Sequence, residues 1–232
     1  SYYKDWVDFA KELDLPVEFD AGRKHDFSKL VQNAEALIST SIAEGFGLAF
    51  LEPWLENKPL IGRKLPEITT DFEDAGLDLS GLYSTLPVPL DWIGEEPFFD
   101  ALETAMKQSY AAYAKAWQPT DFERAKEVLV HEGKVDFGIL DEELQRKVIR
   151  HLVECPQDRA LLPSFHPEID HELIKKNRAI VCANYGIEAY GQRLLGIYKA
   201  LADTDPGEVS AVSAANLLDA FLQPSRFNLL RT

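Results

Sequence analysis

Over about the first ninety residues, the spacing of apolar positions alternates between helical and strand-like. Apolar residues three or four positions apart predict helices over 3–13, 27–34 and 48–57, and short apolar runs predict strands over 16–19, 36–40 and 59–62. Asp26 stands where it would cap the second of these helices. Helices and strands in alternation are typical of βαβ units around a parallel sheet. Such a sheet binds ligands at the carboxyl ends of its strands.

After about Asp91 the alternation stops and helical spacing dominates. The pattern predicts helices over 97–117, 121–132, 141–154, 172–184 and 187–202, and a weaker one over 211–222. Thr120 and Glu123 are placed as a capping box for the helix that begins at Asp121. We therefore expect an α/β chain with a Rossmann-like part over 1–92, a mainly helical region over 93–202 and a tail over 203–232.

Composition and charge narrow the classes of function. Hydrophobic residues make up 46% of the 232 residues, and the formal net charge is −15. Such an acidic chain lacks the basic stripe of a nucleic-acid surface, and no apolar run is long enough for a transmembrane helix. The N-terminus has no signal-peptide pattern. Cys155 and Cys182 show no metal or redox spacing, which favours a reducing, cytoplasmic location.

The segment from Ser41 to Glu52 carries the most informative chemistry. It lies between a predicted strand and a predicted helix, and Gly45 and Gly47 would let a ligand approach its backbone. Amide groups that also open a helix favour an anion such as a phosphate. Gly47 and Glu52 would lie roughly 7.5 Å apart in a helix, at ~1.5 Å per residue. That spacing suits a diphosphate at the turn and a ribose at Glu52, with Glu44 facing the group beyond.

The residues alone leave a second interpretation open. Glycine-rich turns after strands are common in α/β proteins, and both glutamates could simply be solvated. Physical chemistry by itself therefore does not decide between a phosphate-binding turn and a structural one.

The segment Glu44-Gly45-Phe46-Gly47-Leu48 through Glu52 resembles the glutamate-seven-glutamate signature of glycosyltransferase family 4 and its relatives. The flanking residues also agree with that family: Ser41, Pro59-Leu60-Ile61, Pro66-Glu67-Ile68, Asn184-Tyr185 and Ala189-Tyr190-Gly191-Gln192-Arg193-Leu194-Leu195. The resemblance is close over residues 1–70 and about 176–202, and faint between them. It implies the C-terminal, donor-binding domain of a GT-B enzyme, in which two Rossmann-like domains face each other.

The resemblance also implies roles for individual residues. Glu44 would be the catalytic glutamate and contact hydroxyls of the donor sugar, and Glu52 would hold the ribose of a nucleotide-diphosphate sugar. The amides around Phe46, Gly47 and Leu48 would meet the diphosphate. Transfer would proceed with retention through an oxocarbenium-like state. The family usually needs no metal, and we expect no cofactor besides the donor substrate.

The chain departs from the family pattern in one respect. The arginine and lysine that grip the diphosphate lie upstream of this motif in the family, and the expected acceptor-binding N-terminal domain is also absent from this sequence. We therefore expect the chain to bind a donor but not to transfer sugar alone. Faces left exposed by the absence of that domain would favour self-association.

Other signals carry less weight. Arg23-Lys24 and Arg63-Lys64 each follow a predicted strand, so Arg23 or Arg63 could face the phosphates, although basic pairs in loops are usually solvated. The segment from His166 to His171 could suggest metal ligands, but it fits a helix-capping turn better. The aromatic residues over 92–117 are expected in a core or an interface rather than in a sugar platform.

Two alternatives to a transferase remain from the sequence. The first is a non-catalytic sugar-nucleotide-binding or assembly module that uses the helical region as its interaction surface. The second is a sugar-nucleotide epimerase of the same two-domain architecture, which the turn around Glu44 matches less well.

Overall fold

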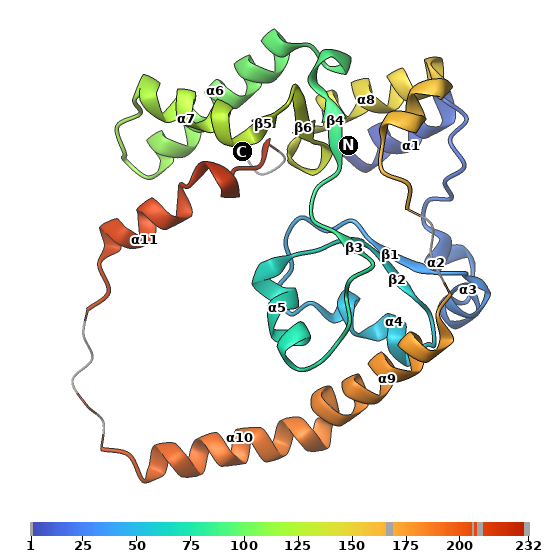
Figure 1. Ribbon diagram of the computed structural model, residues 1–232, viewed down its shortest axis with the longest axis vertical. Helices are drawn as coiled ribbons and strands as arrows, with labels where there is room; N and C mark the ends of the chain where they lie inside the picture. Colours follow the sequence, from blue (N-terminus) through green and yellow to red (C-terminus); the bar gives the residue numbers. More distant parts are fainter. Residues whose placement is uncertain (1, 166–168, 206, 208–210, 230–232) are drawn as a thin grey trace. The chain divides into compact units, whose positions relative to one another are not determined.

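A computed structural model describes residues 2–165, 169–205, 207 and 211–229. The chain divides into two compact units (Figure 1). The first unit comprises residues 1–10, 15–84 and 165–209, and the second comprises 11–14, 85–164 and 210–232. The predicted mainly helical region therefore contributes to both units. The α/β class is confirmed, with a small parallel sheet in the first unit.

The first unit contains a three-stranded parallel sheet in the order β1-β2-β3. Its strands are β1 (Leu37–Ser39), β2 (Leu60–Arg63) and β3 (Leu82–Tyr83). Ser39 pairs with Gly62, and Arg63 pairs with Tyr83. Because the strands are parallel, their carboxyl ends lie at one edge of the sheet. This is the edge at which an α/β sheet binds ligands.

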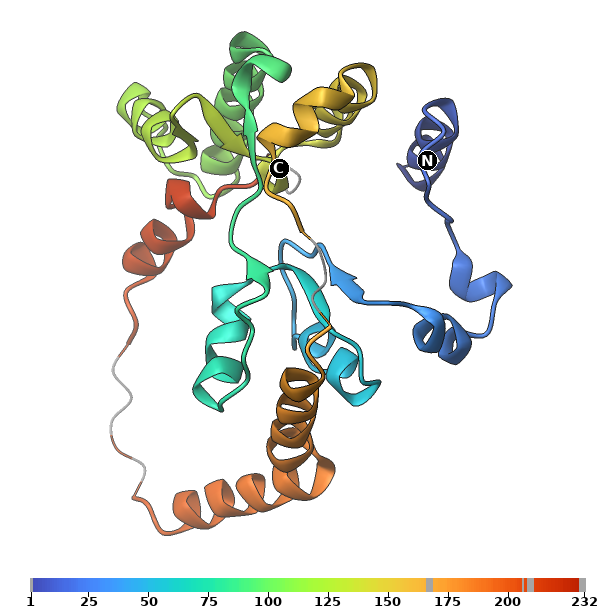
Figure 2. The ribbon, with the colours of Figure 1, turned by 45° about the vertical axis from the view of Figure 1, so that its right-hand side comes forward.

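The first unit also contains several helices. They are α2 (Ala21–Lys24), α3 (Phe27–Asn33), α4 (Glu52–Leu55), α5 (Pro66–Asp74), α9 (His171–Tyr185) and α10 (Ile187–Ala202), with a 3-10 helix at Leu48–Phe50; α1 (Tyr2–Glu12) begins in this unit. The predicted cap of α3 is confirmed, because Asp26 accepts a hydrogen bond of 3.0 Å from the Lys29 amide. α10 continues from α9 and carries no buried residue (Figure 2).

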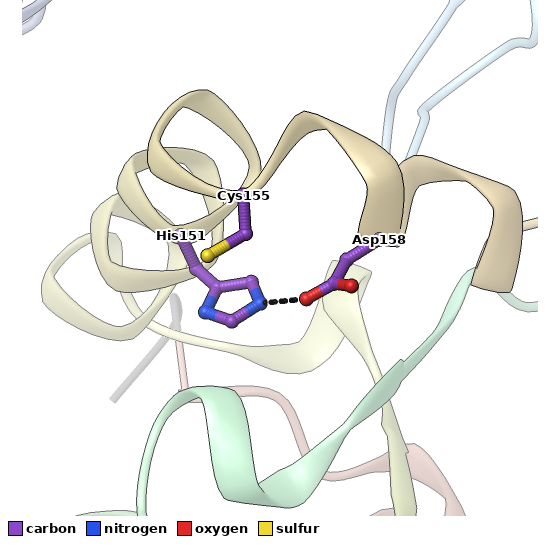
Figure 3. Close-up of side chains that lie close together, drawn as sticks. All are labelled: His151, Cys155 and Asp158. Atoms are coloured by element: carbon purple, nitrogen blue, oxygen red, sulfur yellow. Dashed lines mark hydrogen bonds and ion pairs between the residues drawn. The ribbon is translucent and has the colours of Figure 1, made fainter.

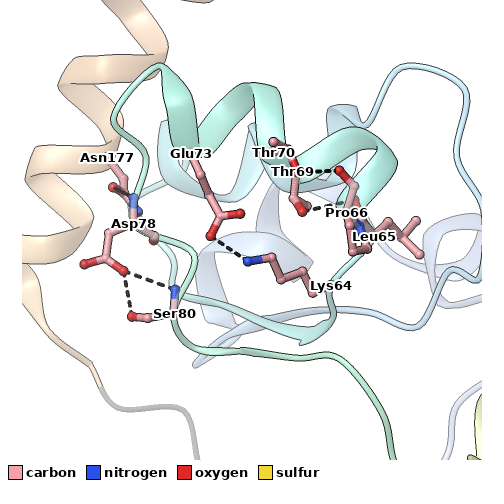
Figure 4. A network of polar contacts seen from close by, with 9 residues as sticks. All are labelled: Lys64, Leu65, Pro66, Thr69, Thr70, Glu73, Asp78, Ser80 and Asn177. Carbon is pink, nitrogen blue, oxygen red and sulfur yellow. Dashed lines mark hydrogen bonds and ion pairs between the residues drawn. The ribbon is translucent and has the colours of Figure 1, made fainter.

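The core of the first unit joins the sheet to α4, α5 and α9. Its buried residues are Phe50, Leu51, Trp54, Leu60, Leu65, Phe72, Leu77, Leu79, Ile174 and Val181. One polar side chain of α9 is also fully buried: the Asn177 amide accepts from the Asp78 N–H at 3.0 Å and donates to the Asp78 carbonyl at 2.8 Å (Figure 4). A buried amide satisfied on both sides fixes α9 to the loop before β3.

Three expectations for the first unit are wrong. Residues 16–19 form no strand. The helix expected over 48–57 is a 3-10 turn followed by the four-residue α4, because Pro53 near the start of α4 cannot donate to the preceding turn. The apolar run over 36–40 predicts a buried strand, whereas in β1 (Leu37–Ser39) only Ser39 is buried. Ile38 is 65% exposed in β1, which is an edge strand of the sheet.

The second unit combines helices with a small antiparallel sheet in the order β4-β6-β5. Its strands are β4 (Pro87–Pro89), β5 (Val130–His131) and β6 (Lys134–Asp136). Its helices are α6 (Glu95–Ala112), α7 (Pro119–Leu129), α8 (Glu142–Glu154) and α11 (Ala214–Phe221), with 3-10 helices at Leu90–Trp92, Phe137–Ile139, Pro156–Leu161 and Pro224–Arg226.

The sequence pattern misses this antiparallel sheet. The helix expected to reach Glu132 ends at Leu129, and a hairpin follows in which Glu132 and Gly133 both have positive φ, 50° and 70°. Positive φ at both central residues is typical of a tight hairpin turn. The predicted capping box is also wrong. α7 begins at Pro119, so Gln118 and Asp121 form the box instead of Thr120 and Glu123.

The second unit has the larger hydrophobic core. Its buried residues are Val88, Leu90, Ile93, Phe98, Leu102, Ala105, Met106, Tyr110, Ala125, Val135, Leu140, Leu144, Val148, Leu222 and Leu229. Of the aromatic residues over 92–117, Phe98 and Tyr110 are buried in this core, while Trp92, Phe99 and Trp117 pack at its edge. The expectation that they serve as core is confirmed for these five residues. None of the helices in the described ranges is long and apolar enough to cross a membrane.

Candidate functional site

The glycine-rich turn lies at the carboxyl end of β1. The strand ends at Ser39, an irregular segment runs to Gly47, and the 3-10 turn and α4 then lead to Glu52. The neighbouring strand, β2, ends at Arg63, one residue beyond the Ser39–Gly62 pair. The structure therefore brings the start of the turn and Arg63 to the same edge of the sheet.

The two glycines of the turn have different surroundings. Gly47 has a φ of 70°, and a Cβ atom there would overlap Ile68 Cγ2 and lie 3.1 Å from Phe72 Cε2. Both the backbone conformation and the packing therefore require glycine. A Cβ at Gly45 would meet nothing within 4 Å. The turn is therefore packed against Ile68 and Phe72 at Gly47, whereas the space beside Gly45 is empty.

The backbone donors expected of an anion site are present in the turn. Within the described part of the chain, no residue accepts a hydrogen bond from the amides of residues 45–49. The expected contribution of a helix dipole is small, however. The 3-10 turn has three residues and α4 has four, and a macrodipole needs a longer run of aligned peptides. Anion binding here would depend on the amides themselves.

The two glutamates of the motif are held differently. Glu44 is half-buried, and one of its carboxylate oxygens accepts a hydrogen bond of 2.5 Å from Ser41 Oγ. This bond orients Glu44 and leaves its other oxygen available. Glu52 is exposed at the first position of α4. α4 is held in turn by the Trp54 indole, which donates to the Phe50 carbonyl at 2.9 Å.

A buried hydroxyl at the end of β1 was not singled out from the sequence. Ser39 is 6% exposed, and no described residue is a hydrogen-bond partner of its Oγ. Gly62, with a φ of 130°, lies so close to Ser39 that a Cβ would overlap the Ser39 carbonyl. A buried hydroxyl without a partner costs roughly 1–3 kcal/mol. The only sequence signal was a strand that ends in small hydroxyl residues.

The two candidate arginines lie in different settings. Arg63 is half-buried at the end of β2. The next residue, Lys64, forms a 2.7 Å ion pair with Glu73 of α5 (Figure 4). Arg23 belongs to the short helix α2, its side chain is 85% exposed, and it pairs with Asp20 at 3.8 Å. In the described ranges, no hydrogen bond or ion pair joins Arg23 to the glycine-rich turn.

The segment from His166 to His171, singled out in the sequence as a possible metal site, is described only in part. His166, Pro167 and Glu168 lie outside the described residues. Asp170 caps α9 by accepting from the amides of Glu172 and Leu173, as the capping interpretation predicts.

In the described ranges, one group of three potential ligands comes together elsewhere. It consists of His151, Cys155 and Asp158 in the second unit (Figure 3). The signal for this cluster was available in the sequence as a histidine and a cysteine four residues apart, followed by an aspartate three residues later.

Comparisons of the chain with protein-family models, curated proteins and solved structures found no match. The function of the candidate site must therefore be argued from its residues and geometry.

Proposed function

We propose that the chain is the donor-binding part of a retaining GT-B glycosyltransferase and binds a nucleotide-diphosphate sugar at the turn from Ser41 to Glu52. One observation carries this proposal. The turn lies at the carboxyl edge of a parallel sheet, and Gly47 occupies a position that only glycine can fill. A backbone fixed in this way, with free amides, suits the close approach of a diphosphate.

Each part of the donor has a matching group in this arrangement. Amides of Phe46, Gly47 and Leu48 would bind the diphosphate, whose charge grows as the glycosidic bond breaks, so that fixed donors lower the barrier. Glu52, exposed at the start of α4, would accept from the ribose hydroxyls. Glu44, oriented by Ser41, would accept from hydroxyls of the donor sugar with its second oxygen.

Arg63 is better placed than Arg23 to supply positive charge to the phosphates. Arg63 lies at the end of the strand adjacent to β1, and a diphosphate needs at least one cation in a chain of net charge −15. Arg23 has no described contact with the turn and would have to reach it from α2.

Apolar side chains around the turn support a site that is completed by more protein. Ile38, Phe46 and Leu48 are 65%, 88% and 55% exposed, although they flank or belong to the motif. Exposed apolar side chains at a binding site are often covered by a ligand or a partner. An acceptor-binding domain that closes over the donor would cover them, and transfer to a sugar or other small acceptor would then need that domain.

Calorimetric titration with UDP, GDP and ADP, each with and without an attached sugar, tests the proposal. We expect one of these nucleotides or nucleotide sugars to bind. Glu52→Gln should weaken that binding about 10- to 100-fold, since a hydrogen bond to a charged group contributes about 1.5–3 kcal/mol. Glu56→Gln is the matched control, because Glu56 is also exposed and follows α4 directly. No heat with any ligand, or equal losses in the two variants, would overturn the proposal.

One observation favours the alternative of a non-catalytic binding module. α10 presents Tyr190, Ile197 and Leu201 at 55–63% exposure and contributes nothing buried to its own unit. An assembly module would use such a face to bind a partner. Sugar transfer by a protein that includes an acceptor domain upstream of this chain would exclude the alternative, and nucleotide-sugar binding without transfer would favour it.

A further inference from the structure

A histidine, a cysteine and an aspartate converge at the end of α8 in the second unit (Figure 3). The candidate ligand atoms of His151, Cys155 and Asp158 all lie within 4.8 Å of one another, and all three residues are half-buried. The His151 imidazole donates a 2.7 Å hydrogen bond from Nε2 to Asp158 Oδ2. The cluster is separate from the glycine-rich turn, which belongs to the other unit.

Local backbone geometry brings these side chains together. His151 is in the last turn of α8 and Cys155 is its C-cap, so that the two residues, four positions apart, share one face. The Cys155 amide donates to the His151 carbonyl at 2.7 Å. Pro156 then starts a 3-10 helix, in which the Asp158 amide donates to the Cys155 carbonyl at 3.0 Å. The ligand set is therefore fixed by consecutive hydrogen-bonded turns.

We propose that His151, Cys155 and Asp158 bind a single zinc ion. Imidazole nitrogen, thiolate sulfur and carboxylate oxygen are the three ligand types that zinc uses in proteins. Magnesium and calcium take oxygen ligands and would leave the sulfur and the imidazole unused. With the thiol deprotonated, one thiolate and one carboxylate neutralise the two charges of the ion. This neutrality suits a half-buried site.

The observed spacing requires only small side-chain adjustments. Zinc bonds of about 2.0–2.3 Å at tetrahedral angles place two ligand atoms about 3.3–3.7 Å apart. His151 Nε2 and Asp158 Oδ2 are 2.7 Å apart and would separate by about half an ångström. The metal would replace the proton that they share. The widest pair, which lies within 4.8 Å, would close by about 1 Å, which rotation of the Cys155 side chain can supply.

Trp92 fixes the orientation of the His151 ring, which a metal-binding histidine needs. Its ring stacks on the His151 imidazole with centroids 4.5 Å apart and planes 21° apart. Stacking holds the ring in one orientation, a role that outer-shell contacts usually play around metal ligands. Three protein ligands leave a fourth position for water, as in open zinc sites.

A purely structural role accounts for part of the cluster. A histidine in the last turn of a helix interacts favourably with the carbonyl end of the dipole, and its bond to Asp158 would strengthen that effect. This role gives no function to the Cys155 sulfur, which lies beside both groups. The two explanations therefore differ most in what they predict for Cys155.

Titration of the purified, tag-free chain with zinc, and separately with cobalt, tests the proposal. We expect one ion per chain, with a proton released from the thiol to the buffer on binding. Cobalt should give the near-ultraviolet charge-transfer absorption of a thiolate ligand. Cys155→Ser should abolish that absorption and weaken zinc binding more than about 100-fold, beyond the 10- to 100-fold typical of an outer-shell partner.

Matched variants make each outcome decisive. Cys182→Ser removes the other cysteine, which is exposed on α9, and His131→Ala removes an exposed histidine of β5; both should bind zinc as the wild type does. Asp158→Asn keeps the shape of its side chain but should weaken binding, with circular dichroism as the check on folding. No thiolate band with cobalt, or a band that survives in Cys155→Ser, would overturn the proposal.

Discussion

The glycine-rich turn of the first unit and the helix end of the second unit, that is, the cluster of His151, Cys155 and Asp158 at the end of α8, are assembled by different physical means. The turn depends on strand pairing, because Ser39 and Gly62 meet only when β1 and β2 form a sheet. The helix end depends on local hydrogen bonds, because its three side chains lie within eight consecutive residues. A site of the first kind needs the whole unit to fold. One of the second kind needs little more than α8 and the turn after it.

Both units bury large apolar side chains, Phe50 in the first and Phe98 in the second, but the first unit also exposes such side chains beside its candidate site. In the second unit Phe98, Leu102 and Leu140 are completely buried. In the first unit Ile38 and Phe46 remain mostly exposed beside the candidate site. Exposed side chains contribute little to the stability of the unit that carries them. Their position at the motif is better explained by something that covers them, either a ligand or more protein.

The largest expected effect comes from paired phenylalanine truncations. Phe98→Ala should lower the free energy of unfolding of the second unit by about 3–5 kcal/mol, because it removes a fully buried ring. Phe46→Ala should change stability by no more than about 0.5 kcal/mol, because that ring is 88% exposed. Hydrogen exchange measured peptide by peptide assigns each loss to its unit. Comparable losses in the two variants would contradict the contrast between buried and exposed rings.

The glycines of the turn provide the next comparison. Gly47→Ala should destabilise the first unit by about 2–4 kcal/mol, since it adds strain at positive φ to a clash with Ile68 and Phe72. Gly45→Ala should be nearly neutral, because its Cβ meets open space and its φ is not positive. Urea denaturation of the two variants measures the difference. A neutral Gly47→Ala would mean that the turn is not fixed by packing.

Helices were predictable from the sequence wherever one face is strongly apolar or a cap is evident. The bounds expected for α3, α8 and α10 agree with the structure to within a residue or two. Strands were less predictable, because a strand exists only with a partner. Residues 16–19 have strand-like composition and no partner, whereas β5 and β6 are very short and pair across a turn that the helical pattern hides.

In the candidate sites, too, some features were predictable from the sequence and others were not. The sequence correctly predicted that the segment from Ser41 to Glu52 lies between a strand and a helix, but not the short α4 or the exposed Ile38, because both depend on tertiary packing. The cluster at Cys155 was missed for a different reason. The spacing between the two cysteines carries no signal for it, whereas the spacing of Cys155 to His151 on the same helix face does.

The smallest expected effect appears in acid and concerns a polar loop of the first unit. Asp78 accepts hydrogen bonds from the Ser80 hydroxyl at 2.6 Å and from the Ser80 amide at 3.1 Å (Figure 4). These bonds, the hydroxyl first, lower the pKa of the Asp78 carboxyl below its ordinary value, and burial opposes them only in part. Asn177 of α9 fixes the backbone of the same loop, through the Asp78 N–H and carbonyl.

A lowered pKa in the folded state stabilises the protein above the unfolded pKa of about 3.9, and this contribution is lost as the pH falls through the lower folded value. Ser80→Ala removes the larger of the two causes. It should therefore cost stability near pH ~7 and progressively less below about pH 4. Thermal denaturation across this range measures the difference, with Ser84→Ala, another exposed serine of the same unit, as the control. A loss that stays constant down to about pH 2 would show that the Ser80 hydroxyl acts on loop packing rather than on the charge of Asp78. A stability loss that becomes smaller in acid would show that the Asp78 carboxylate is ionised in the folded first unit.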